Sequence, residues 1–325
     1  MNRHLTPKRL RLLIQAVFCL FCIWTGVRFQ QFLLWASAKT EVFSPRPPAV
    51  EGFLPISAFM ALKQFLLTGV WDQIHPAGLT LLLTALGIAF ILRKGFCATI
   101  CPVGFLHNLL ERVGRALGFS RTPGPRLSTA LTVPKYLLLG FFVWITWMQM
   151  DVPSIRQFLT GSYNLTADAR MLDFFLAPST IALTVLGVLA LLALIVPSFW
   201  CRALCPYGAL LGLASMLSPL AVHRAQDKCI DCGKCNQACP SGIDVKTKDR
   251  VGSPECIGCM QCVGACPVEG CLEARIAGRW RVSPLLVLAA AAALLLAAWA
   301  LAEATGHWDN AIPPTMLKRI YMPKG

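Results

Sequence analysis

The chain has 325 residues, of which 56% are hydrophobic and 14% are charged, and it carries a formal net charge of +14 at pH 7. With a mean hydropathy of +0.59, this composition excludes an ordinary soluble protein of the same length and predicts an integral membrane protein.

Apolar stretches recur along the chain and predict membrane spans, each of which needs about 20 apolar residues, with a lower limit near 17. A further apolar stretch, residues 53–70, contains Pro55, Lys63 and Gln64, and we predict a helix lying at the membrane interface there. The five predicted spans are residues 12–38, 76–92, 134–150, 177–199 and 284–302.

The charges between these spans predict the orientation. With the N-terminus inside, the cytoplasmic segments hold nearly all of the excess of Lys and Arg, whereas the external segments hold equal numbers of basic and acidic residues. This division follows the positive-inside rule, so the basic charge reflects topology and does not indicate nucleic-acid binding. We therefore predict a multi-pass protein of the cytoplasmic (inner) membrane with an external C-terminus.

The first apolar stretch has two interpretations. The basic sequence MNRHLTPKRLR, the apolar run and Trp35-Ala36-Ser37-Ala38 together fit a secretory signal with its cleavage site. However, the apolar run exceeds the usual 7–15 residues of such a signal, which favours an uncleaved anchor.

The sequence repeats itself with a period of 104 residues, because RKGFCATICPVGFLHNLL matches PSFWCRALCPYGALLGLA. Each copy of the motif C-x3-C-P-x-G follows a predicted span of the same polarity, so we predict two repeats of two helices, residues 1–120 and 121–225. The axis relating them would bring four cysteines together at the inner membrane face, where they would hold an additional thiolate-bound metal or redox centre. The four are Cys97, Cys101, Cys201 and Cys205. Alternatively, Pro102 and Pro206 only mark helix breaks, and the cysteines are packed or form a redox-active dithiol.

Two cysteine runs follow, each with the spacing C-x2-C-x2-C-x3-C-P, at residues 229–240 and 256–267. Three cysteines two residues apart present three thiolates to one 4Fe-4S cubane, and the fourth ligand comes from the other run. We predict that cluster 1 is held by Cys229, Cys232, Cys235 and Cys266, and cluster 2 by Cys256, Cys259, Cys262 and Cys239. Structural zinc is the alternative, but it usually shows two separated C-x2-C pairs. The nearby Cys271 is predicted to be a bystander.

The predicted fold is therefore an all-α integral membrane protein of five spans, with a two-fold internal repeat of two-helix units and a small α+β ferredoxin module of the bacterial two-cluster type. The module covers residues 226–273. Residues 274–325 then supply the fifth span and a short external tail.

This combination of motifs resembles the NapH and NosR type of membrane polyferredoxin, and most closely its YccM-like electron-transport members. FCATICPVG, WCRALCPYGALLG and the two ferredoxin runs carry the resemblance, which extends from about residue 10 to 318. It includes residues 46–69, 75–78, 135–142 and 162–175. The resemblance implies electron transfer at the cytoplasmic membrane, between the quinol pool and a respiratory reductase or its maturation system. This chain lacks the large external flavin-binding domain of the NosR arrangement.

The sequence thus predicts a membrane-bound iron-sulfur protein that relays single electrons between a membrane or quinol donor and a redox partner. It contains no acid, base or nucleophile constellation, so we expect a component of an oxidoreductase system, not a self-contained enzyme. The alternative is a redox-dependent metal-handling, maturation or sensing factor for a respiratory enzyme. Beyond two 4Fe-4S clusters, a further thiolate-bound metal and a quinone are the candidate cofactors.

Overall fold

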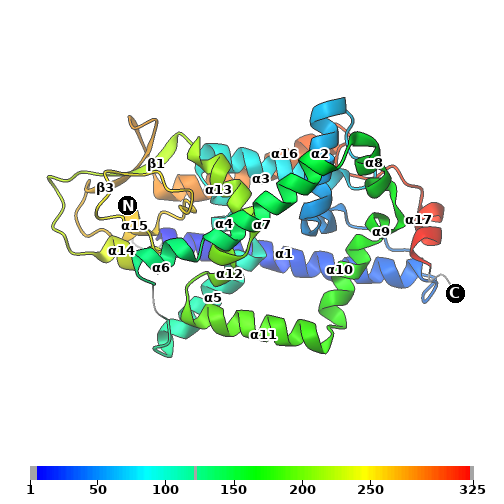
Figure 1. Ribbon diagram of the computed structural model, residues 1–325, viewed down its shortest axis with the longest axis horizontal. Coiled ribbons are helices and arrows are strands. Elements are labelled where there is room, and N and C mark those ends of the chain that lie inside the picture. Colours follow the sequence, from blue (N-terminus) through cyan, green and yellow to red (C-terminus); the bar gives the residue numbers. More distant parts are fainter. Residues whose placement is uncertain (1–5, 121–122, 323–325) are drawn as a thin grey trace. The chain divides into compact units, whose positions relative to one another are not determined.

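The computed structural model describes residues 6–120 and 123–322 and is mostly helical (Figure 1). The chain forms two compact units. Unit 1 comprises Met1–Cys19, Ala85–Gly140 and Leu186–Leu295, and unit 2 comprises Leu20–Thr84, Phe141–Val185 and Leu296–Gly325.

Within the described residues, three helical segments are long and apolar enough to cross a membrane. They are α1 (Pro7–Ala36), the segment Leu127–Gln149, and α16 (Pro284–Ala304). In the second of these, α7 (Val133–Val143) continues as a π-helical turn, η2 (Trp144–Gln149). All three coincide closely with predicted spans.

The other two predicted spans are shorter helices. α3 (Pro76–Leu92) has 17 residues and α11 (Thr180–Ile195) has 16. At about 1.5 Å per residue, each is shorter than the ~30 Å hydrocarbon core. α11 counts as a fourth candidate span only together with α10 (Ala167–Leu176), from which it is bent by 74°. Three to four spans are therefore supported by length and composition, and five remains a prediction.

The long helices expose apolar side chains. In α1, Leu13, Leu20 and Ile23 are 58%, 65% and 59% exposed, and Ile181 of α11 is 77% exposed. Apolar surface of this extent is matched to lipid and not to water.

The sixth apolar stretch forms α2 (Pro55–Thr68), whose Lys63 is buried. Its ammonium group donates to the carbonyl oxygens of Thr146, Trp147 and Met150, at 3.0, 3.1 and 2.6 Å. These carbonyl groups lie at the C-terminal end of the helix that contains η2. The lysine therefore pairs with the unpaired acceptors of that helix end, and its positive charge interacts favourably with the negative end of the helix dipole. Lys63 thus has a structural role within unit 2.

The ferredoxin module lies in unit 1 and contains a four-stranded antiparallel sheet of order β2-β1-β3-β4. Its strands are β1 (Leu220–Arg224), β2 (Arg250–Val251), β3 (Leu272–Ile276) and β4 (Trp280–Val282). Two short helices, α14 (Lys234–Gln237) and α15 (Gln261–Ala265), pack on each other, and each begins within one of the cysteine runs. Figure 1 shows β1, β3, α14 and α15 gathered in one part of this unit. The sheet thus draws in residues on both sides of the predicted module.

The remaining helices of the described residues are short. They are η1 (Pro48–Phe53), α4 (Gly95–Thr99), α5 (Pro102–Ala116), α6 (Pro125–Ala130), α8 (Val152–Thr160), α9 (Ser162–Leu165), α12 (Phe199–Ala203), α13 (Pro206–Met216) and α17 (Pro314–Tyr321).

Candidate iron-sulfur centres

The first cavity of the ferredoxin module is lined by Cys239, Cys256, Cys259 and Cys262, the four cysteines predicted to hold cluster 2. Apolar side chains form most of the remaining wall: Val222, Ile243, Val245, Val251, Ile257 and Met260. This is the dry, sulfur-lined environment that a 4Fe-4S cubane requires.

The second cavity is lined by Cys229, Cys232, Cys235 and Cys266, the four cysteines predicted to hold cluster 1. Each cavity thus takes three cysteines from one run and the fourth from the other, which is the interlocked arrangement expected from the spacing. The second cavity differs from the first in that Cys271 also lines it.

The two cysteine runs share a backbone conformation that turns their thiols toward a common point. In the first run, Asp231 and Gly233 have positive φ values of 59° and 69°. In the second run, Gly258 and Met260 occupy the corresponding positions, with φ of 67° and 57°. Glycine adopts this left-handed region freely, and aspartate more readily than most residues, so the local sequence favours the loop.

The two ligand sets lie in different electrostatic surroundings. The pKa of Cys229 lies below its ordinary value because the backbone N–H of Asp231 and the side chain of Arg224 donate hydrogen bonds to its thiolate. By contrast, burial raises the pKa of Cys239 to about 12, and nearby Cys259 adds to the effect. Cluster 1 therefore faces hydrogen-bond donors, whereas cluster 2 lies in a less polar environment.

The C-x3-C-P-x-G motifs form the same local structure twice in unit 1. The first cysteine of each motif lies on a one-turn helix, α4 or α12, and the second is the extended N-cap residue of α5 or α13. The prolines, Pro102 and Pro206, occupy the first helical position and force the preceding cysteine out of the helical region. The glycine permits a close approach, since a Cβ at Gly104 would lie 2.6 Å from the carbonyl oxygen of Cys97.

The four thiols of these motifs lie near one another. Burial, together with the charges of Cys101 and Cys205, raises the pKa of Cys97 to about 12. Burial also raises the pKa of Cys201 well above its ordinary value, and each of the other three thiols adds to it. Each residue keeps some solvent exposure. Among the described residues, no three His, Cys, Asp or Glu side chains are arranged as ligands of a single metal ion.

Two buried lysines accompany the four thiols and were not identified from the sequence. Lys94 and Lys135 both act on Cys97 and Cys205, and their charges lower the pKa of each thiol. Both also pair with Glu255, whose Oε2 lies 2.5 Å from Lys135 Nζ and 3.7 Å from Lys94 Nζ. The signal that could have revealed this role is Lys135 itself, a cation inside an otherwise apolar predicted span.

The loop that carries the cluster 2 ligands packs directly on the rest of unit 1. Glu255 immediately precedes Cys256 and links it to Lys135. A Cβ at Gly258 would lie 2.8 Å from the carbonyl oxygen of Leu92, so this contact is backbone to backbone. Arg93, 1% exposed, donates to the carbonyl oxygen of Ser253 at 2.6 Å. Cluster 2 is therefore the ferredoxin site that adjoins the end of α3.

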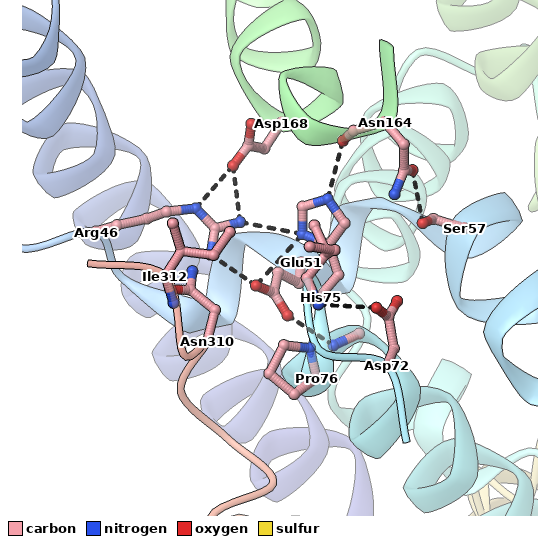
Figure 2. Close-up of polar contacts among 12 residues, drawn as sticks. Arg46, Glu51, Ser57, Asp72, His75, Pro76, Asn164, Asp168, Asn310 and Ile312 are labelled. Atoms are coloured by element: carbon pink, nitrogen blue, oxygen red, sulfur yellow. Dashed lines mark hydrogen bonds and ion pairs between the residues drawn. The ribbon is translucent and has the colours of Figure 1, made fainter. Parts of the chain in front are cut away.

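Unit 2 contains a separate buried ionic network, drawn in Figure 2. Arg46 lies 2.6 Å from Glu51 and 2.8 Å from Asp168, and its guanidinium also contacts the ring of His75. The other ring nitrogen of His75 lies 2.9 Å from the carbonyl oxygen of Asn164. These contacts join η1, the start of α3 and the α9–α10 segment. The sequence alone does not reveal this network because its members are far apart in the chain.

Two family models match this chain. A 4Fe-4S dicluster domain matches residues 221–267, and a 4Fe-4S binding domain matches twice, at residues 74–120 and 177–224. The second model therefore covers each C-x3-C-P-x-G motif once. Together they identify an iron-sulfur protein of the ferredoxin type.

The chain is also similar to whole proteins. It is 36% identical to YccM of Escherichia coli (strain K12), which is named as an electron transport protein, over 96% of this chain and 88% of YccM. It is 33% identical to the methylamine utilization ferredoxin-type protein MauN of Methylorubrum extorquens, over 58% of this chain and 62% of MauN. It is 29% identical to NirI of Paracoccus denitrificans, over 64% of this chain and 30% of NirI. No solved structure matches the chain. With paired ferredoxin cavities, apolar membrane helices and near full-length similarity to YccM, the chain belongs to the membrane polyferredoxin-type family of electron-transport proteins.

Proposed function

We propose that this protein relays single electrons at the inner face of the cytoplasmic membrane. The donor would be the quinol pool or a membrane redox protein, and the acceptor a respiratory reductase or its maturation system. When bound, 4Fe-4S clusters supply one-electron chemistry without bond making, which fits a relay.

The observation that best supports a relay is that the cluster 2 loop contacts two lysines that lie beside the thiols of the C-x3-C-P-x-G motifs. Glu255, next to the ligand Cys256, pairs with Lys94 and Lys135, and both lysines act on Cys97 and Cys205. The ferredoxin module is thus held against the membrane part of unit 1. A tether at each end of the module maintains a high effective concentration for electron exchange.

In this proposal the ferredoxin cysteines hold two cubanes: cluster 1 on Cys229, Cys232, Cys235 and Cys266, and cluster 2 on Cys256, Cys259, Cys262 and Cys239. The cysteines Cys97, Cys101, Cys201 and Cys205 hold a third, thiolate-bound centre. The support for this third centre is the balance of charge around its four thiols. Lys94 and Lys135 together carry one positive charge more than Glu255 neutralises, and an anionic set of metal-bound thiolates would offset it in this buried place.

The same proposal includes five spans, the two-fold repeat and a cytoplasmic ferredoxin module. The repeat is supported by the shared geometry of the two C-x3-C-P-x-G motifs and by the single family model that matches both. The charge distribution of the connecting segments supports the orientation.

Iron content tests the number of centres. We expect the protein, purified without oxygen, to contain clearly more than the eight iron atoms that two 4Fe-4S clusters supply. A Cys201→Ser variant should lose only the excess, with the electron paramagnetic resonance (EPR) signals of the two clusters unchanged. A parent protein with eight iron atoms would contradict an iron-containing third centre.

Turnover tests the relay. Membranes that contain the protein should oxidise a quinol analogue with an artificial acceptor, and a Cys259→Ser variant should not. Stoichiometric metal binding without quinol oxidation would instead favour the metal-handling or maturation role.

A further inference from the structure

The cavity of cluster 1 contains a fifth cysteine. Cys271 lines it together with the four predicted ligands, and the residue is 3% exposed. Its thiol interacts with those of Cys229 and Cys266, which come from the two different runs. Cys271 is therefore not the bystander expected from the sequence but part of the cavity wall.

The sheet fixes Cys271 in this position. It directly precedes β3, and its carbonyl oxygen accepts a hydrogen bond of 2.8 Å from the backbone N–H of Ala225. Arg224, at the end of β1, is the register partner of Leu272. Two neighbouring strands thus carry Arg224 and Cys271 to the same wall.

Arg224 is a second donor at this wall. Its side chain is 12% exposed, lines the cavity and donates to Cys229. Its Nε is buried and has no hydrogen-bond partner among the described residues. A buried N–H without a partner is costly, and an acceptor inside the cavity, such as a cluster sulfide, would satisfy it.

The cavity of cluster 2 has a different wall. Its lining residues, all in the described part of the chain, include no Arg, Lys or extra cysteine beyond the four ligands. Arg11 acts on Cys259, but its Nε donates to the carbonyl oxygen of Ala98 at 2.8 Å. Cluster 1 is also nearer to solvent, because Cys232 is exposed, whereas Cys259 is buried.

Hydrogen bonds to the sulfurs, local charge and solvent exposure set the potential of an iron-sulfur cluster. A donated hydrogen bond or a nearby cation stabilises the more negative, reduced cluster. In the structure the Cys271 thiol lies 3.8 Å from the carbonyl oxygen of Ala225, to which it donates. We propose that this thiol turns its proton toward cluster 1, that Arg224 also donates a hydrogen bond to the cluster, and that the two donors raise its reduction potential above that of cluster 2. Cluster 1 is then the electron-accepting member of the pair. This inference rests on the proposed function, because both cysteine sets must hold clusters.

Redox titration of the purified full-length protein, monitored by EPR, tests the proposal. Cys271→Ala should lower the midpoint of cluster 1 by about 59 mV if the lost donor changes the reduced-to-oxidised ratio tenfold. Cys271→Ser, which keeps a donor, should shift it less. Arg224→Gln should also lower this midpoint, and it provides an independent test if the Cys271 variants assemble poorly.

The controls separate this inference from the proposed function. Cys232→Ser and Cys259→Ser identify which signal belongs to each cluster, and Ser241→Ala, in the wall of the other cavity, should leave the cluster 1 midpoint unchanged. A parent protein without two clusters would refute the proposed function itself. Two clusters whose cluster 1 midpoint is unaffected by Cys271→Ala and Arg224→Gln, or lies below that of cluster 2 in the parent, would overturn the inference alone.

Discussion

Gly114 lies against the backbone of another helix in unit 1, and replacing this glycine by alanine tests how the two C-x3-C-P-x-G motifs are held together. Gly114 lies in α5, which follows Cys101, and Leu194 lies near the end of α11, shortly before Cys201. A Cβ at Gly114 would lie 2.1 Å from the carbonyl oxygen of Leu194. Neither group is a flexible side chain, so the two helices must move apart.

The required movement is about 1.3 Å, which would turn the 2.1 Å approach into the 3.4 Å of an ordinary contact. Overpacking of this kind costs about 1–3 kcal/mol, and a contact between backbone atoms belongs at the upper end. The higher helix propensity of alanine returns about 1 kcal/mol. We therefore expect Gly114→Ala to lower the free energy of unfolding by about 2 kcal/mol.

Gly87→Ala is the matched control, because a Cβ there would meet no atom within 4 Å. Thermal unfolding of the detergent-purified proteins should give a lower melting temperature for Gly114→Ala than for the parent. Gly87→Ala should melt at the parent temperature or above it, because it gains helix propensity without a clash. Gly114→Ala should also contain less of the iron assigned to the third centre. If Gly114→Ala melts at the parent temperature and keeps all its iron, the close approach of α5 and α11 is wrong.

Two further predictions concern buried ionic contacts. Glu255→Gln should destabilise the protein by about 1.5–3 kcal/mol, the value of a hydrogen bond to a charged group, and should expose the ferredoxin module to limited proteolysis. The exposed Glu269→Gln is its control, and equal proteolysis of the two variants would contradict the contact. Burial lowers the pKa of His75, but the hydrogen bond and charge of Glu51 outweigh burial, so the pKa is raised. The protonated His75 ring stabilises the folded protein fully below about pH 6.5, and this stabilisation is lost as pH rises through the raised pKa. The melting temperature should therefore fall toward pH 9 in the parent but not in His75→Gln.

The predicted ligand sets depend on geometry that is largely local in the sequence. The spacing of each cysteine run determines which thiols reach one cubane, and the structure brings those same cysteines together in two cavities. The iron-sulfur character and the family followed from these motifs alone. The apolar stretches likewise overlap the three long helical segments over most of their length.

The residues that surround the predicted ligands could not be predicted, because their positions depend on contacts between distant segments. Cys271 reaches the cavity predicted for cluster 1 only through the pairing of β1 with β3. Lys135 and Glu255 meet across 120 positions. In the same way, Lys63 stands in the sequence as a charged residue within an apolar stretch, and only the structure shows that it caps another helix of unit 2. A hydropathy pattern does not reveal such partners.

The sheet at the edge of the ferredoxin module also limits how the module can move. The chain enters through β1 shortly after α13 and leaves through β4 just before α16, and β3 pairs with both strands. The entering and leaving strands are thus held on either side of β3, and only a few residues separate the sheet from α13 and α16. A module held in this way cannot swing between distant sites, so under the proposed function a redox partner would have to reach the module where it lies. Solvent viscosity should then affect partner encounter but not electron exchange within the protein.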